Sequence, residues 1–284
     1  MLYKLSRVCY NIFVYLIRKE GCCINNIFDS HCHYDDSAFD NDRSIVLDKL
    51  LLSENSPVDK MVHASTDEQS ALFGISTAEK YENFYTSIGF HPECLDKLPE
   101  NYQAKLEELY QKACLTKKLV AVGEIGLDYH YEGYDKNAQI SLFTYQVEFA
   151  VKKSLPVIVH CREATEDCMQ ILSEYTPRGV VHCFSGSAET AEQLLKMGMY
   201  IGFTGALAFK NAKKARRALA VVPMDRLLLE TDCPYMAPPP YRGERCESWM
   251  IEETAKVVAE EKGISPQEVL DITNKNACRL FGIE

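Results

Sequence analysis

The sequence predicts a single-domain (β/α)8 TIM barrel, a fold of the α/β class. Eight short runs of β-branched and apolar residues follow residue 26, and segments of helical character separate them. We compare the runs by one polar or small residue near the end of each. The shortest spacing between neighbouring reference residues is 22 residues, from His160 to His182, and the longest is 36 residues, from Glu124 to His160. Each spacing fits one strand, one helix and two loops, so eight such units match the usual size of this barrel.

The predicted strands are 27–33, 58–65, 84–91, 119–129, 155–161, 179–186, 199–205 and 226–234. A helix is expected over 137–153, where apolar residues repeat along one stripe. The run Ser265-Pro266-Gln267-Glu268 is typical of a helix start, because Ser can cap, Pro suits the first turn and Glu can bond back. That last helix is expected to end near Leu280. An open doubly wound sheet is the competing fold, but no G-x-G-x-x-G opens the first unit.

Residues 1–26 are predicted to be an N-terminal extension, poorly ordered or forming a surface helix, and 27–284 the (β/α)8 domain that carries the candidate site. The rest of the chain contains no segment with the composition of an interdomain linker. The apolar run in the extension is too short to cross a bilayer, so no integral membrane association is expected. Its first acidic residue is Glu20, so a mitochondrial presequence is the alternative to a cytoplasmic location.

The formal net charge of −10 argues against a wide basic surface for duplex DNA. A nucleic-acid substrate would need another source of positive charge, and bound divalent cations can supply it. Twelve cysteines occur without a C-x-x-C pair, in a chain too long for a small disulfide scaffold. The composition therefore favours a reducing compartment.

Side chains able to bind metal end several of the predicted strands, where barrel enzymes keep their active sites. The candidate ligands are His31, His33, Glu124, His160, His182 and Asp232. His31 and His33 lie two apart and share a strand face, which leaves Cys32 on the other face. The same alternation places Cys161, Cys183 and Cys233 away from the site, as packing residues. A single strand histidine is more often a core residue, but burying this whole set without a cation would be too costly.

The chain resembles the TatD-type metal-dependent deoxyribonucleases, a branch of the amidohydrolase superfamily. The blocks that carry the resemblance are FDSHCHYDD, SIGFHPE, AVGEIGLDY, LPVIVHCREA, VVHCFSGS and LLLETDCPYMAP, and they span about residues 27–283. The resemblance implies two divalent metal ions bridged by Glu124, one with His31, His33 and Asp232, the other with His160 and His182. Mixed imidazole and carboxylate donors leave Mg²⁺, Mn²⁺ and Zn²⁺ open. The chain departs from the family after the last strand, where Cys246 and Ser248 replace Asn and Pro in a loop expected near the site mouth.

Asp232 and Glu124 are the predicted catalytic residues, with Asp232 accepting the proton of a metal-bound water. His91 and Arg162 are the candidate substrate-binding residues, for a phosphate or a leaving group. Asp128 and Glu230 share strand faces with the candidate ligands Glu124 and Asp232, so each could hydrogen-bond a ligand and support it. The alternative for Asp128 is to cap the loop that follows, and the alternative for Glu230 is a buried acid paired to a neighbouring strand. The basic run at 210–217 either guides a polyanion or forms a solvated helix face.

The candidate site predicts a metal-dependent hydrolase, and the resemblance implies that it removes nucleotides from the ends of single-stranded DNA or RNA. Hydrolysis of an amide, lactone or aminoacyl ester at the same site is the enzymatic alternative. A non-catalytic, metal-stabilised binding protein is the alternative from another class. No obligate protein partner is predicted.

Overall fold

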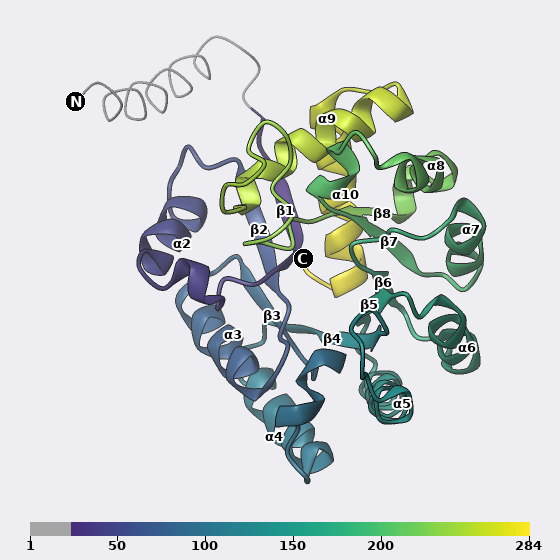
Figure 1. Cartoon of the computed structure of the whole chain (residues 1–284). Helices are drawn as coiled ribbons and strands as arrows, with labels where there is room; N and C mark the ends of the chain where they lie inside the picture. Colours follow the sequence, from purple (N-terminus) through teal and green to yellow (C-terminus); the bar gives the residue numbers. More distant parts are fainter. Residues whose placement is uncertain (1–23) are drawn as a thin grey trace.

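Eight parallel strands form one sheet in the order β1 to β8 in the computed structural model, which describes residues 24–284 (Figure 1). The strands are β1 Ile27–Cys32, β2 Val58–His63, β3 Phe84–Ile88, β4 Leu119–Asp128, β5 Val157–Arg162, β6 Gly179–Val181, β7 Tyr200–Phe203 and β8 Leu227–Leu229. A parallel bridge between Cys32 and Cys233 connects the first strand to the segment after the last. The amide of His33 also donates to the carbonyl of Cys233 at 2.9 Å. The sheet therefore curls into a nearly closed barrel, and the predicted fold class is confirmed.

Helices follow the strands in turn and surround the ring of strands, except for the last helix, which lies behind the ring in the view of Figure 1. They are α2 Arg43–Leu51, α3 Glu68–Lys80, α4 Tyr102–Cys114, α5 Lys136–Lys153, α6 Thr165–Tyr175, α7 Ala188–Lys196, α8 Lys213–Val221, α9 Ile251–Lys262 and α10 Pro266–Phe281. Short 3-10 helices are η1 Ser37–Phe39, η2 Pro92–Lys97, η3 Gly205–Ala208, η4 Met224–Arg226 and η5 Ser248–Met250. Ser265 and Glu268 form the predicted capping box at the start of α10, which satisfies amide groups that the first helical turn leaves unpaired.

Two apolar clusters hold the barrel together. The larger one lies between the strands and the helices. The smaller one gathers residues such as Phe28, Val120 and Ile158, which lie in the amino-terminal halves of their strands, around the end of α10. There the ring of Phe281 stacks on Phe28 with 6.2 Å between centroids. Helix α10 thus covers the amino end of the barrel and leaves the carboxyl end open for chemistry.

The predicted extension at 1–26 lies almost wholly outside the described residues, so its form and its boundary stay predictions. Asn26, which is described, donates to Asp271 of α10 at 2.8 Å, and this contact fixes the approach to β1. Among residues 24–284, no helix is long and apolar enough to cross a membrane.

Candidate metal centre

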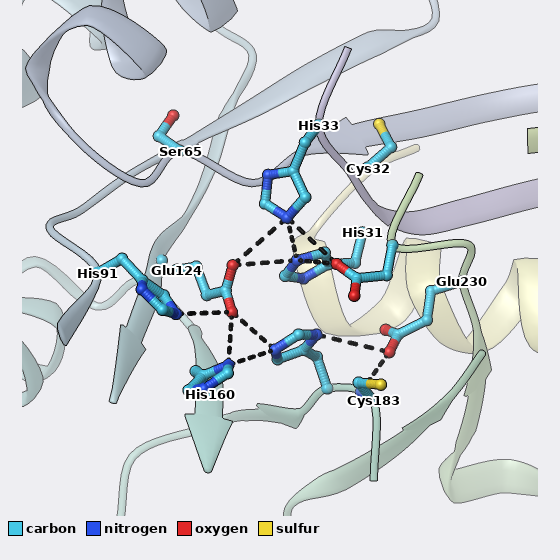
Figure 2. A network of polar contacts seen from close by, with 12 residues as sticks. His31, Cys32, His33, Ser65, His91, Glu124, His160, Cys183 and Glu230 are labelled. Atoms are coloured by element: carbon cyan, nitrogen blue, oxygen red, sulfur yellow. Dashed lines mark hydrogen bonds and ion pairs between the residues drawn. The ribbon is translucent and has the colours of Figure 1, made fainter. Parts of the chain in front are cut away.

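The six predicted ligands come together at the carboxyl ends of the strands, around the carboxylate of Glu124 (Figure 2). On one side, Oε2 of Glu124 lies 3.2 Å from Nε2 of His31 and 3.5 Å from Nε2 of His33. Oδ1 of Asp232 lies 3.6 Å and 3.3 Å from the same two nitrogens, which are themselves 2.9 Å apart. Four donor atoms from strands β1 and β4 and the segment after β8 therefore face one point.

The other carboxylate oxygen of Glu124 faces a second group of imidazoles. Its Oε1 lies 2.7 Å from Nε2 of His182, 3.0 Å from Nδ1 of His160 and 3.4 Å from Nε2 of His91. The nearest nitrogens of His160 and His182 are 3.2 Å apart. Glu124 thus stands between two donor groups and offers one oxygen to each, which is the arrangement that a bridging carboxylate needs.

The donor sets fit divalent cations. A tetrahedral metal with bonds of about 2.1 Å holds its ligand atoms about 3.4 Å apart, close to the distances within each group. Three overlapping groups could each hold an ion: His31, His182 and Asp232; His31, His33 and Glu124; and His91, Glu124 and His160. Two imidazole nitrogens at 2.9 Å need a proton or a cation between them, because their lone pairs otherwise repel. The centre is therefore able to bind metal.

Electrostatics keep the central carboxylate ionised. Burial alone would raise the pKa of Glu124, but the charges of His182, His91 and His31 outweigh burial and hold the pKa well below its usual range. Burial likewise opposes the protonated form of His33, yet its hydrogen bond to Asp232 and the nearby carboxylates raise its pKa to about 10. A metal ion would have to displace that proton.

Asp128 supports one of the imidazoles. Its Oδ2 lies 2.9 Å from Nε2 of His160, the ring nitrogen that faces away from Glu124. A carboxylate behind a histidine ligand fixes the ring orientation and strengthens the ligand. Oδ1 of Asp128 also accepts the amide of His130, so the loop-capping alternative holds as well.

Glu230 supports the opposite side of the centre. It is fully buried, accepts the amide of Cys183, and has an oxygen 3.8 Å from Nδ1 of His182 (Figure 2). Ser30 donates to its other oxygen at 3.3 Å. Burial raises the pKa of Glu230 to about 7 against the opposing effect of His182. Glu230 therefore connects strands β1 and β8 with the turn that follows His182.

The sequence analysis missed Asp29, a fully buried carboxylate beneath the centre. It accepts from the amide of His31 and from both the amide and the hydroxyl of Thr231. Ser248 donates a further hydrogen bond at 2.6 Å. Burial nevertheless raises the pKa of Asp29 to about 6. Its position two residues before His31 was an available signal, because a strand places such residues on one face.

Ser248 and Cys246 are not at the site mouth, which corrects the expectation from the sequence. Ser248 is fully buried and bonds both Asp29 and the hydroxyl of Tyr34, and Cys246 is 1 % exposed. Neither residue lines the cavity above the centre. The two departures from the family pattern therefore change packing beneath the ligands.

Strand alternation failed at Cys183. Cys32 and Cys233 are fully buried as predicted, and the thiol of Cys161 lies beside Cys168 of α6, on the helix side of β5. Cys183 instead lines the cavity above the centre. Cys183 has a φ of 44°, so the chain turns at this residue and alternation no longer applies. Asp232 has a φ of 59°, and a similar turn after β8 presents its carboxylate to the site.

The two predicted substrate-binding residues have different surroundings. His91 is buried, begins η2 and belongs to the second donor group, so its position suits a metal ligand as well as a phosphate partner. The side chain of Arg162 is 43 % exposed and packs over the ring of Tyr131 at 5.3 Å. Its guanidinium lies 3.9 Å from Asp128. Arg162 therefore faces the open space above the centre.

A cavity of about 860 Å³ opens above the ligands. Its lining includes the acidic residues Asp35, Asp36 and Glu93, which come from the first half of the chain. It also includes the basic residues Arg162 and Lys214, which come from the second half. Lys214 belongs to the basic run at 210–217 and lies in the first turn of α8. Of the remaining histidines, His63 is buried beside Ser70 and His130 pairs with Glu163 on the surface.

Comparison with known proteins agrees with this architecture. The family model described as TatD related DNase matches residues 28–282. An uncharacterized metal-dependent hydrolase of Bacillus subtilis, YabD, is 37% identical over 260 residues, covering 90% of this chain and 99% of that protein. The 3'-5' ssDNA/RNA exonuclease TatD of Cronobacter sakazakii is 31% identical, covering 90% of this chain and 97% of that protein. The crystal structure of the Escherichia coli TatD homologue YjjV has a TM-score of 0.84 and 29% identity, covering 92% of this chain and all of that one.

Proposed function

The chain belongs to the TatD-related DNase family of metal-dependent hydrolases, and on this premise we propose that it hydrolyses phosphodiester bonds at the ends of single-stranded DNA or RNA. The observation that carries the proposal is the position of Glu124, with one oxygen toward each of two donor groups. Two cations side by side suit a phosphodiester, whose attacking and leaving oxygens both carry negative charge during displacement.

We propose that His31, His33, Glu124 and Asp232 hold one divalent ion, and that Glu124, His160 and His182 hold the second. Mg²⁺, Mn²⁺ or Zn²⁺ would supply an activated water and neutralise charge on the phosphodiester. Asp232 is proposed to accept the proton of that water at Oδ2, because its Oδ1 faces His31 and His33. Its side chain is 16 % exposed, and although burial opposes ionisation, His33 and His31 keep its pKa below the usual value.

The chain's own cations support a polyanionic substrate. The net charge is −10, yet Arg162 and Lys214 both line the cavity above the centre. The guanidinium of Arg162 lies over the ring of Tyr131, 5.3 Å from its centroid, and suits a phosphate oxygen. His91 is proposed to contact the substrate or to complete the second metal site. The relative from Cronobacter sakazakii, which is named as an exonuclease on single-stranded DNA and RNA, favours a strand end as the substrate.

A cytoplasmic location is proposed together with this function. The nine described cysteines are all free thiols, which suits a reducing compartment.

The test removes metal with a chelator, restores Mg²⁺, Mn²⁺ or Zn²⁺ singly, and follows degradation of end-labelled single-stranded oligonucleotides. We expect metal-dependent loss of terminal nucleotides by the wild type. Asp232→Asn and His182→Ala should each lose activity while keeping the wild-type circular dichroism spectrum. Simple esters and lactones are assayed in parallel with the same metal-loaded preparations.

Two outcomes contradict the proposal. Intact oligonucleotides beside rapid ester or lactone turnover would assign the site to another bond. Global unfolding on chelation, with no hydrolysis by any metal-loaded form, would make the centre structural.

A further inference from the structure

A second cavity of about 300 Å³ opens beside the catalytic one. It lies where the loop after β5 and helix α6 meet the loop after β6 and helix α7. Cys161, Arg162, Phe184, Ser185 and Lys214 line both cavities, so the two spaces share one wall. None of the roles assigned above uses this side pocket.

Apolar and polar groups line the side pocket in nearly equal measure. Met169 of α6 and Leu194 of α7 face it together with Val181 and the ring of Phe184. Ser185 and Thr190 add hydroxyl groups. Small-molecule sites are typically concave and largely apolar, with a few polar groups that fix orientation, and their volumes start at roughly 300 Å³. A flat heteroaromatic ring with polar edges fits these surroundings.

Positive charge lies where the side pocket meets the catalytic cavity. Arg162 and Lys214 line both spaces, and Lys214 forms no ion pair with any other residue in 24–284. Glu163, the acid that lines the side pocket, is paired with His130 at 2.7 Å. A group bound across the opening would therefore place its anionic part beside these two cations and its ring in the side pocket, against Met169 and Phe184.

Phe184 is held in place by local packing. Its amide donates to the carbonyl of Gly202 at 2.9 Å, and its ring meets Phe203 edge to face at 6.4 Å. A Cβ added at Gly186 would lie 2.5 Å from the Phe184 ring, so only glycine leaves the ring where it is. The shared wall thus contains one fixed aromatic ring, whose exposed edge faces both cavities, and bases stack on aromatic rings whatever their sequence.

We propose that the side pocket binds the nucleobase of a nucleotide whose phosphate lies between the metal centre and the cations Arg162 and Lys214. This inference rests on the proposed function and deepens it, because it makes the substrate a nucleotide with an attached base. The pocket recognises a base mainly by its flat apolar face, so it accepts all bases and rejects a sugar phosphate that has none.

Direct binding tests the proposal without requiring turnover. The probes are deoxyadenosine monophosphate and 2-deoxyribose 5-phosphate, titrated calorimetrically into metal-loaded protein. We expect the wild type to bind the nucleotide about tenfold more tightly, in line with one base stacked on an aromatic ring. Met169→Trp fills the pocket and should bring this ratio to about one. Gln170→Trp, at the neighbouring exposed position outside the pocket, should leave the ratio unchanged.

A second variant guards against misfolding of the first. Thr190→Phe fills the pocket from α7, and Glu189→Phe is its exposed control. Thermal melting identifies the variants that fold. Equal wild-type affinities for the two probes, or a preference that survives in a folded pocket-filling variant, would overturn the proposal.

Oligonucleotide hydrolysis by the wild type separates this inference from the proposed function. Hydrolysis without a preference for the nucleotide probe would reject the base pocket and keep the nuclease. A preference abolished by Met169→Trp, without hydrolysis, would keep the pocket and reject the nuclease.

Discussion

The two ends of the barrel contrast in what they bury. The carboxyl end holds titratable groups, and His31, Glu124 and His182 there are at most 5 % exposed. The amino end holds an apolar cluster in which Phe281 of α10 packs on Phe28. Burying charged groups costs free energy unless a partner compensates, whereas burying apolar surface lowers the free energy of the folded state. Apolar packing at the amino end and in the helix layer therefore stabilises the fold. It offsets the free-energy cost of holding charged groups close together at the carboxyl end.

This contrast predicts that activity and stability can be changed separately. Substitutions at the carboxyl end should alter metal binding and rate more than folding. Those at the amino end should alter folding more than rate.

The largest effect is expected for Glu124→Gln. The amide cannot offer an anionic oxygen to both donor groups, so kcat/KM on oligonucleotides should fall about 10³-fold or more. Metal content measured by mass spectrometry should fall with it. Glu107→Gln, on the surface of α4, is the matched control and should retain activity. Full activity in Glu124→Gln would end the assignment of a bridging role.

Phe281→Ala tests the amino end. The ring is 5 % exposed, and its loss should lower the free energy of unfolding by about 3 kcal/mol because a cavity replaces its packing. Urea unfolding measures the change, and kcat should stay near the wild-type value. Ile45→Ala removes a side chain that is 68% exposed and should change stability by less than about 0.5 kcal/mol. A large loss of kcat in folded Phe281→Ala would show that the ends are coupled.

Metal affinity should rise with pH. Burial opposes protonation of His33 and His160, but hydrogen bonds to Asp232 and Asp128 and the charge of Glu124 raise both pKa values to about 10. A metal must displace these protons, so affinity should fall about tenfold per pH unit for each proton as the pH drops from 9 to 6. Competition titrations at four pH values measure the slope, and a flat profile would contradict the protonated metal-free centre.

The same raised pKa values predict how stability changes with pH in the metal-free protein. The folded pKa exceeds the ordinary histidine value of 6.5. The stability that protonation of these two histidines gives the folded state is therefore fully present below pH 6.5. It is lost as the pH rises toward 10. Urea unfolding of chelated protein at pH 6 and pH 9 measures it.

Asp128→Asn should have a moderate effect. The amide keeps the size of the side chain but removes the charge behind His160, which should lower metal affinity or activity about 10- to 100-fold. Asp167→Asn provides the control, since Asp167 pairs with Lys136 away from the ligands. Equal activities of the two variants would leave Asp128 only its loop-capping role.

Asp42→Asn should have the smallest effect. Two hydrogen bonds from Arg245, at 2.6 and 2.8 Å, connect Asp42 to the loop after β8. The side chain is 38% exposed, so solvent screening limits the loss to about 0.5–1 kcal/mol. The hydrogen bond from Arg245 lowers the pKa of Asp42, so its contribution is present above pH 4 and is lost as the pH falls through the lowered pKa. A difference from wild type that persists at pH 2 would exclude this ion pair as its cause.

The sequence by itself determined the barrel and the members of its centre. Strand and helix periods are local properties, so eight alternating units could be read from residue 27 onward, and the capping box of α10 was evident from Ser265 and Glu268. The candidate ligands could be named because most of them lie at or just after the carboxyl end of a strand, and all parallel strands of a barrel end at the same rim.

Only the tertiary structure decided how neighbouring rim residues divide their roles. It placed His91 among the donors, buried Ser248 against Asp29 and turned Cys183 into the cavity. Each of these positions depends on distances between strands or on turns with positive φ after a strand. The alternation of side chains along a single strand gives no information about distances to other strands or about such turns. The sequence therefore predicted which residues reach the rim but not what each one contacts there.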